Sequence, residues 1–204
     1  GGNPSGSRGL MAAFCALDVE TAARECGSIC QVGIAHFCNG SIIDSWVTLV
    51  DPETDVSPGH TRIHGIASHH LAGQPTFAEI WPEFQERTMD CPVASHTFFD
   101  RTALRAAAER YALPCPVMPW IDSCRLARRA WPHQRRQGGY SLRALAGMLD
   151  LRFRHHDALE DAIVAGRIVV AAAAELNVTI EVLARQACLE AGMSQDSYPD
   201  RSSQ

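Results

Sequence analysis

The stretch that most constrains the fold is residues 13–20, Ala-Phe-Cys-Ala-Leu-Asp-Val-Glu, close to the start of the chain. An apolar run ends there in two carboxylates, Asp18 and Glu20, one residue apart. Residues two apart in a strand point to the same side, so the stretch predicts a buried strand that projects both acids from one face. Neighbouring buried carboxylates repel each other and favour a hard divalent cation between them. A strand that ends in a solvated acidic turn is the alternative, and other parts of the chain must decide.

A hairpin is predicted next. Asn39-Gly40 is a dipeptide typical of two-residue hairpin turns, and it separates strand-like runs at 28–35 and 41–50. We therefore expect an antiparallel meander of three strands, with both acids on the first. The segment at 51–76 is rich in Pro, Gly, His and Asp and predicts a long loop with one short helix.

Short strands and helices alternate in the rest of the chain. Apolar segments at 91–95 and 120–123 predict two more strands. Capping boxes of Thr76 with Glu79 and of Asp157 with Glu160 mark two helix starts, and Ser141 is expected to cap a third. This order predicts an α/β fold with a mixed central sheet flanked by helices. The predicted helices cover about 76–88, 99–111, 141–149, 157–176 and 180–191, with a short one after residue 123 and a basic loop at 134–139.

Length and composition favour a single domain. The chain has 204 residues, of which 46% are hydrophobic and 20% charged, as is ordinary for a globular protein. We expect this domain at 11–193, a flexible segment or cloning remnant at 1–10 and a disordered polar tail at 194–204. No apolar run of about 18 residues occurs, so we expect no membrane partner. Eight cysteines without any C-x-x-C pair favour reduced thiols and a cytoplasmic location.

Basic residues are unevenly distributed along the chain. The net charge is −5, and all 18 basic residues are Arg. Eight of them lie between residues 125 and 154, where Asp150 is the one acid. Solvated helix faces account for part of this cluster, but a patch that follows the phosphates of a nucleic acid explains the clustering better.

Further acids lie at predicted helix starts. Asp100 follows Phe99 in the first turn of one helix, and Asp161 lies in the first turn of the long helix at 157–176, shortly after His156. Acids in a first turn also complement the helix dipole, which is the simpler explanation for Asp100. The histidine-rich loop at 51–76 could also bind a metal, but no carboxylate or Cys accompanies its histidines at a helical ligand spacing.

The order Asp18-x-Glu20, then Asp100, then His156-x4-Asp161 resembles the DEDDh exonucleases. This is the DnaQ-like 3′–5′ exonuclease family, which includes the proofreading epsilon subunit of bacterial DNA polymerase III. The resemblance runs from about residue 14 to residue 173 and implies a ribonuclease H-like fold with a five-stranded mixed sheet. Shorter fragments that also look like the family lie at 17–21, 63–66, 75–77, 99–100 and 141–142.

The resemblance also implies a mechanism. Members of this family release nucleoside 5′-monophosphates from a 3′ end with two divalent metal ions, Mg²⁺ or Mn²⁺, which suit phosphodiester hydrolysis. Carried over by motif, Asp18, Glu20, Asp100 and Asp161 hold the metals, and His156 is the general base. A histidine with a pKa near 6.5 suits this work at neutral pH. His155 is the rival base, and the five-residue spacing to Asp161 selects His156.

Substrate contacts are implied at two further places. Ile66 and Phe99, with His64 nearby, are candidates for packing against the terminal base and sugar, although a core role for Phe99 is the alternative. Ser95 and His96 stand where many relatives have His-Asn beside the substrate strand. This departure leaves the preferred substrate open.

The leading functional hypothesis is a metal-dependent 3′–5′ exonuclease on single-stranded or frayed DNA, in DNA repair or proofreading. The first alternative is the same chemistry on RNA, as in RNase T-like or oligoribonuclease-like relatives. Residues 63–66 favour the polymerase III type and hence DNA. A non-catalytic nucleic-acid-binding module is the other class, and it conflicts with four retained acids, because buried carboxylates without a metal are unfavourable. The expected partner is nucleic acid, with a DNA polymerase as a further candidate, and the oligomeric state stays open.

Overall fold

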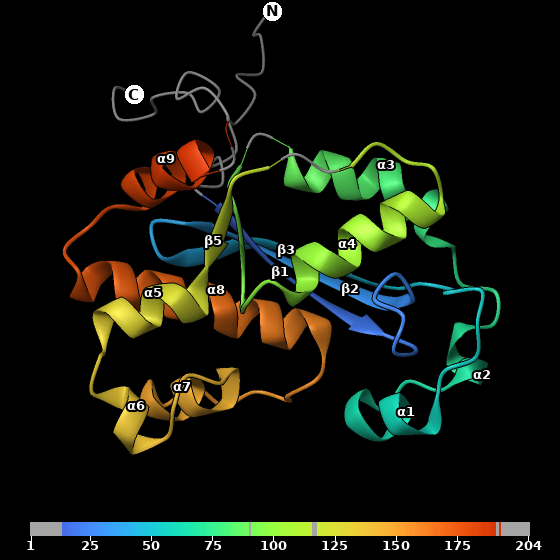
Figure 1. Cartoon of the computed structure of the whole chain (residues 1–204), viewed down its shortest axis with the longest axis horizontal. Coiled ribbons are helices and arrows are strands. Elements are labelled where there is room, and N and C mark those ends of the chain that lie inside the picture. The colour runs from blue at the N-terminus through green and yellow to red at the C-terminus, as the bar shows by residue number, and fades with distance from the viewer. Residues whose placement is uncertain (1–13, 90, 116–117, 191, 193–204) are drawn as a thin grey trace, which may run out of the picture.

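The computed structural model describes residues 14–89, 91–115, 118–190 and 192 (Figure 1). Its strands are β1 (Phe14–Thr21), β2 (Ile29–Cys38), β3 (Ser41–Leu49), β4 (Val93–Ser95) and β5 (Trp120–Asp122). They form one sheet of five strands in the order β3-β2-β1-β4-β5. The β1–β2 and β2–β3 pairs are antiparallel, and the β1–β4 and β4–β5 pairs are parallel. The predicted mixed sheet and meander are confirmed, and the segments predicted at 1–10 and 194–204 lie outside the described residues.

The helices within the described ranges are α1 (Pro58–His64), α2 (Ser68–Leu71), α3 (Phe77–Thr88), α4 (Phe99–Arg110), α5 (Ser123–Ala130), α6 (Gln134–Gln137), α7 (Leu142–Met148), α8 (Ala158–Glu175) and α9 (Ile180–Glu190). α3 and α4 cover one face of the sheet, and α5 and α8 cover the other (Figure 1). In this part of the chain no single helix has the length and hydropathy of a membrane span. α8 and α9 have that length and hydropathy only when they are taken together, and the chain bends by 108° between them.

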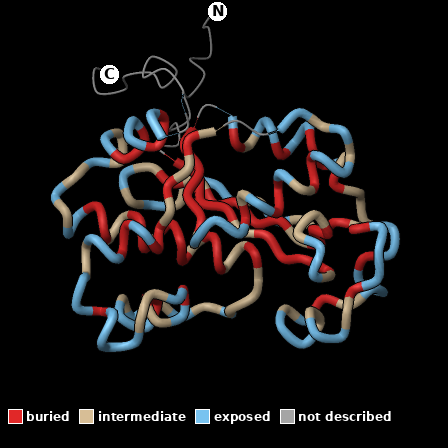
Figure 2. Tube along the Cα trace, in the orientation of Figure 1, coloured by how far each residue is buried: buried red, intermediate tan, exposed pale blue. Residues whose placement is uncertain are grey.

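β1 is the central strand and is apolar toward both helix layers. Leu17 and Val19 belong to the core cluster that contains α3 and α4, whereas Ala16 belongs to the cluster that contains α8. Figure 2 shows the buried residues concentrated along the sheet and the helix faces that cover it. Asp18 and Glu20 continue the Ala16 series along the strand, so both acids project toward α8.

Two glycines allow α8 to lie directly on the sheet. A Cβ on Gly33 of β2 would lie 2.3 Å from backbone atoms at the start of α8, and a Cβ on Gly166 would lie 2.3 Å from the ring of Phe37. Real Cβ atoms do not approach that closely, so any larger residue would push the helix away. Gly33 pairs with Asp18 in the β1–β2 register, and α8 therefore begins beside the acids.

The predicted helix caps form. Thr76 and Glu79 make a reciprocal capping box at the start of α3, and the side chain of Ser141 caps α7. The Asp157 carboxylate caps α8 by accepting the backbone N–H of Glu160 at 3.3 Å, but among the described residues the Glu160 side chain does not return the bond that a capping box requires. A cap and its partner lie only three residues apart, so a sequence can reveal them.

The short helices differ from the prediction. The segment at 134–139, predicted as a loop, contains α6, and the one short helix predicted within 51–76 is in fact two, α1 and α2. Ser57 caps α1, and Gly65 ends it in the left-handed region with a φ of 79°. Helices of one or two turns depend on such end contacts and are too short for an apolar period to predict.

Candidate active site

The acids predicted from the sequence converge at the end of β1. Carboxylate oxygens of Asp18, Glu20 and Asp161 all lie within 4.8 Å of one another. Asp100 lies beneath them, 2% exposed, and its Oδ1 accepts the backbone N–H of Val19 at 3.0 Å. The first turns of α4 and α8 therefore bring two acids to the strand that carries the other two.

A cleft of about 620 Å³ opens above these carboxylates. Its walls come from α1, from the loop between β4 and α4, from α5, and from the loops that precede α7 and α8. Around the acids the lining residues are Val19, Thr21, His60, Ile63, His64, His96, Thr97, Phe99, Cys124, Arg128, Tyr140, Ser141, Leu142, His155 and His156.

Burial and mutual repulsion dominate the electrostatics of the cluster. Burial, followed by the charge of Asp100, raises the pKa of Asp18 well above its usual range. Burial and the charges of Asp161 and Asp100 raise the pKa of Glu20 from 4.5 to about 8. Burial also raises the pKa of Asp100 from 3.8 to about 7, although the hydrogen bond from Val19 opposes the change. Without a counter-charge, the cluster therefore holds protons near neutral pH.

The donor set fits hard divalent cations. Closely spaced carboxylate oxygens are the ligands that Mg²⁺ and Mn²⁺ prefer, and the raised pKa values report negative charge that such ions would offset. A second group, His155, His156 and Asp161, also has ligand atoms within 4.8 Å of one another. Carboxylates of β1 and α8 can thus hold metal at the cleft floor, with Asp100 of α4 buried behind them.

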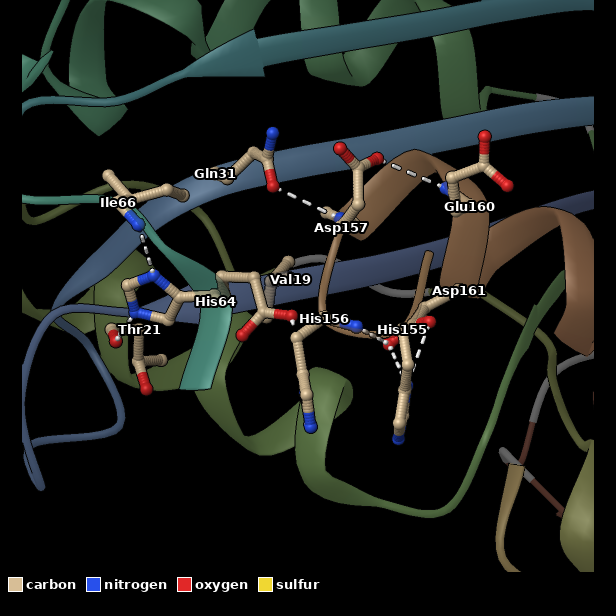
Figure 3. Close-up of polar contacts among 12 residues, drawn as sticks. Val19, Thr21, Gln31, His64, Ile66, His155, His156, Asp157, Glu160 and Asp161 are labelled. Atoms are coloured by element: carbon tan, nitrogen blue, oxygen red, sulfur yellow. Dashed lines mark hydrogen bonds and ion pairs between the residues drawn. The ribbon is translucent and has the colours of Figure 1, made fainter. Parts of the chain in front are cut away.

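The two adjacent histidines lie side by side at the start of α8 (Figure 3). Their ring centroids are 3.9 Å apart with an interplanar angle of 18°. His155 Nδ1 lies 3.0 Å from Asp161 Oδ2, to which the backbone N–H of His156 also donates at 3.1 Å. His156 Nδ1 lies 3.9 Å from Glu20 Oε1 instead. The backbone of His156 has a φ of 67°, which is uncommon for a residue with a side chain and often marks a functional position.

The two imidazoles therefore have different surroundings. His155 is bound to a carboxylate of the cluster, whereas the side chain of His156 is 40% exposed to the cleft. Burial and the neighbouring His155 lower the pKa of His156, with the charge of Asp161 opposing. A neutral imidazole at neutral pH can accept a proton.

His64 lines the cleft, but internal contacts use both of its ring nitrogens (Figure 3). Nδ1 accepts the backbone N–H of Ile66 at 3.0 Å, so the other nitrogen, Nε2, donates to the carbonyl of Thr21 at 3.2 Å. Burial lowers the pKa of His64, which agrees with this neutral form. Ile66 itself is 7% exposed in a small apolar cluster with Leu71 and is absent from the cleft lining. The structure thus brings the face of His64 to the cleft and Ile66 to the core beneath it.

The other predicted substrate residues lie between the end of β4 and the start of α4. Ser95 is buried, and its hydroxyl donates to the carbonyl of Thr97 at 2.9 Å. His96 lines the cleft. Its Nε2 lies 3.0 Å from the Tyr140 carbonyl oxygen, and its Nδ1 lies 2.8 Å from the Ser123 hydroxyl. Phe99 is 46% exposed and lines the cleft, so a core role does not apply to it.

Several cleft residues were missed by sequence reasoning. Ile63 in α1 is 53% exposed and lines the cleft close to the predicted His64. Arg128 in α5 also lines it, with its guanidinium 5.6 Å from the centroid of the Tyr140 ring. The cluster of arginines predicted a phosphate patch, but no signal in the sequence selects Arg128 among them. Nothing in the sequence indicates that Gly33 contacts α8.

A five-stranded sheet of this order, with Asp18, Glu20 and Asp161 clustered at the end of β1, defines a ribonuclease H-like fold. The fold is similar to that of exonuclease X in complex with 5′ overhanging duplex DNA, at a TM-score of 0.67 and 24% identity over 85% of this chain and 99% of that one. It is also similar to the nuclease domain of 3′hExo, a DEDDh family member bound to rAMP, at a TM-score of 0.64 and 20% identity over 78% and 90% of the two chains.

A family model for exonucleases of the RNase T type matches residues 15–169. The chain belongs to this family, as a DnaQ-like 3′–5′ exonuclease. Sequence relatives include the PolC-type DNA polymerase III of Streptococcus thermophilus, 29% identical over 166 residues, and that of Streptococcus mutans, 28% identical over the same length. These alignments cover 78% of this chain but span only 11% of each polymerase. Family membership makes the chain an exonuclease.

Proposed function

We propose that this exonuclease removes nucleotides from the 3′ end of DNA, single-stranded or frayed, and releases nucleoside 5′-monophosphates. The observation that carries the proposal is the set of carboxylates within 4.8 Å of one another on the floor of an open cleft. The likeness to PolC-type polymerases supports a role beside a DNA polymerase, in proofreading or repair. The segment at 63–66 resembles the polymerase III type and so favours DNA over RNA as the substrate, and Ile63 and His64 of this segment line the cleft.

Each acidic residue has a role in this proposal. Asp18, Glu20 and Asp161 hold two divalent ions, Mg²⁺ or Mn²⁺, and Asp100 completes the set from below. Bound ions would supply activation of the attacking water and compensation for the charge on the departing 3′ oxygen. The site is suited to such ions because its own negative charge is otherwise unbalanced.

The two histidines have different roles in this proposal. His156 accepts a proton from the attacking water, because its imidazole faces the cleft and its lowered pKa keeps it neutral at neutral pH. His155 is a positioning residue, since its Nδ1 lies 3.0 and 3.1 Å from the two oxygens of Asp161. A fixed carboxylate binds a metal better than a mobile one.

The apolar and basic walls of the cleft bind the terminal nucleotide. Exposed Ile63 and Phe99 pack against its base and sugar, a contact that tolerates any base. Arg128 lies where a guanidinium can bind a phosphate. His64 and His96 shape the walls as neutral rings, because internal hydrogen bonds engage their nitrogens.

The substrate assignment is tested with 5′-labelled decanucleotides of single-stranded DNA and single-stranded RNA, and with duplex DNA that carries a paired or mismatched 3′ end. Each substrate is incubated with Mg²⁺, Mn²⁺ or EDTA, and the products are resolved by length. We expect stepwise shortening of single-stranded and mismatched DNA with either metal, and none in EDTA. Faster shortening of RNA than of DNA would transfer the proposal to RNA, and retained binding without shortening would favour a non-catalytic module.

A further inference from the structure

A second pocket lies just beyond the rim of the catalytic cleft. It has a volume of about 330 Å³ and lies between the start of α4, β5, α5 and α9. Thr97, in the loop between β4 and α4, lines both the pocket and the cleft. The two hollows are therefore neighbours, separated by a ridge that this loop forms.

The ridge presents an aromatic ring to each side. Phe98 is 58% exposed and lines the pocket, whereas the next residue, Phe99, is 46% exposed and lines the cleft. Thr97 has a φ of 80°, a left-handed conformation that is unfavourable for a β-branched residue. The Ser95 hydroxyl, which donates to the Thr97 carbonyl at 2.9 Å, holds the loop in this conformation. Strain of this kind persists where the surrounding structure fixes it, often at binding sites.

The pocket has an excess of available positive charge. Arg101 of α4 and Arg125 and Arg129 of α5 line it. Arg125 is engaged, because its guanidinium lies 3.4 Å from Glu190 Oε2. Within the described ranges, Arg101 and Arg129 make no side-chain hydrogen bond or ion pair. Asp122, the other acid of the lining, is occupied as the cap of α5, where it accepts the backbone N–H of Arg125 at 2.8 Å.

This combination fits one kind of ligand. Guanidinium groups bind the phosphates of a nucleic-acid backbone, and an exposed aromatic ring stacks on a base of any identity. Trp120, partly buried in the same lining, adds a second aromatic surface. A strand whose 3′ end occupies the cleft must leave it over some part of the rim, and the ridge at Thr97 leads directly to these groups.

We propose that this pocket binds single-stranded nucleic acid upstream of the nucleotide being cleaved. Arg101 and Arg129 bind backbone phosphates, and Phe98 stacks on a base, as the strand crosses the ridge at Thr97. The proposal rests on the proposed function, because it takes the 3′ end of the same strand to lie in the catalytic cleft. These contacts add affinity for strands that are longer than the cleft can hold.

The first test measures binding without hydrolysis. The complete protein in EDTA is titrated against a fluorescent single-stranded decanucleotide at several salt concentrations. For the double variant Arg101→Gln/Arg129→Gln, the slope of log Kobs against log salt should fall by about 1.4, the value for two phosphate contacts on a single strand. The control Arg135→Gln/Arg136→Gln removes two exposed arginines of α6, outside both linings, and should keep the wild-type slope.

The second test uses substrate length. With Mg²⁺, the double variant should raise the KM for the decanucleotide about tenfold, or about 1.4 kcal/mol, because two phosphate contacts are lost. It should leave both kcat and the KM for a dinucleotide unchanged, because a dinucleotide does not extend beyond the cleft. A purely structural defect would instead lower kcat on both substrates.

The outcomes separate this proposal from the proposed function. If the double variant matches the control in salt slope and in KM, the pocket does not bind the strand and the proposal is wrong. If the wild-type protein cleaves no strand but the salt slope still falls in the double variant, the pocket assignment holds and the proposed function is wrong. Phe98→Ala, matched with Leu189→Ala at an exposed apolar residue of α9, should weaken decanucleotide binding where its control does not.

Discussion

At the scale of single residues, the site depends on two consecutive histidines with different partners. His155 contacts both oxygens of Asp161, and His156 faces Glu20 across 3.9 Å. The motif spacing selected His156 as the base, and the geometry adds a distinct role for its neighbour that the sequence did not indicate. Because the two rings stack, replacing either one also exposes the other to solvent.

Kinetics of two variants can separate these roles. His156→Ala should lower kcat by about 10²–10⁴-fold, the range for loss of a general base. His155→Ala should mainly raise the Mg²⁺ concentration needed for half-maximal rate, by about 10–100-fold, because it releases the Asp161 carboxylate that we propose as a metal ligand. Rates measured over a Mg²⁺ titration give both quantities. The reverse pattern, with His155 controlling kcat, would assign the base to His155.

The raised pKa values of the acids predict a pH dependence for the metal-free protein. The pKa of Glu20 is about 8 in the folded state against 4.5 for a free side chain, and that of Asp100 is about 7 against 3.8. Between these limits the two carboxyls bind more protons in the folded state than in the unfolded state, so their contribution to stability is largest at low pH and falls as pH rises.

In EDTA, the unfolding midpoint should therefore decrease between about pH 4.5 and about pH 8, and Mg²⁺ should raise it most at the upper end. Glu20→Gln should reduce this slope, and Asp55→Asn, at an exposed acid outside the cluster, should not. A metal-free midpoint that rises over the same range would contradict the clustering of the acids.

At the scale of elements, the packing of α8 on the sheet decides whether the acids meet. A Cβ on Gly33 would lie 2.3 Å from the backbone of α8, so Gly33→Ala must displace the helix that carries Asp161. We expect a loss of about 1–3 kcal/mol in the free energy of unfolding, together with reduced activity. Gly147→Ala in α7 has open space and should be neutral or stabilising by about 0.4–1 kcal/mol. Denaturant unfolding measures both, and equal stability of the two variants would contradict the close approach.

Elements were predictable from the sequence where their signals are local. The Asn39-Gly40 turn, the cap at Thr76 and the cap at Asp157 each specify a few neighbouring residues, and all three structures form. The contact of Gly33 with α8 was not predictable, because its two partners lie more than a hundred positions apart in the sequence. Nothing in the local sequence distinguishes this glycine from one in a turn.

At the scale of the whole molecule, the sheet order brings segments from the entire chain to one cleft. The family motif predicted that the acids of β1, α4 and α8 would meet, since the motif itself records a shared geometry. The walls of the cleft were less predictable. Ile63 of α1 and Arg128 of α5 both line it, but they lie far apart in the sequence and no motif links them. Ile66, predicted to contact substrate, lies instead in the small core below His64, where its backbone N–H orients that ring.

The measurement that most directly tests the central claim uses Asp18→Asn, a change that keeps the shape of the side chain and removes its charge. Wild type and variant are compared on a 5′-labelled single-stranded decanucleotide over a Mg²⁺ titration, after circular dichroism has shown that both are folded. The wild-type protein should shorten the strand stepwise from the 3′ end, and the variant should lose this activity at every Mg²⁺ concentration. Wild-type rates in the folded variant would contradict a catalytic metal site built on β1.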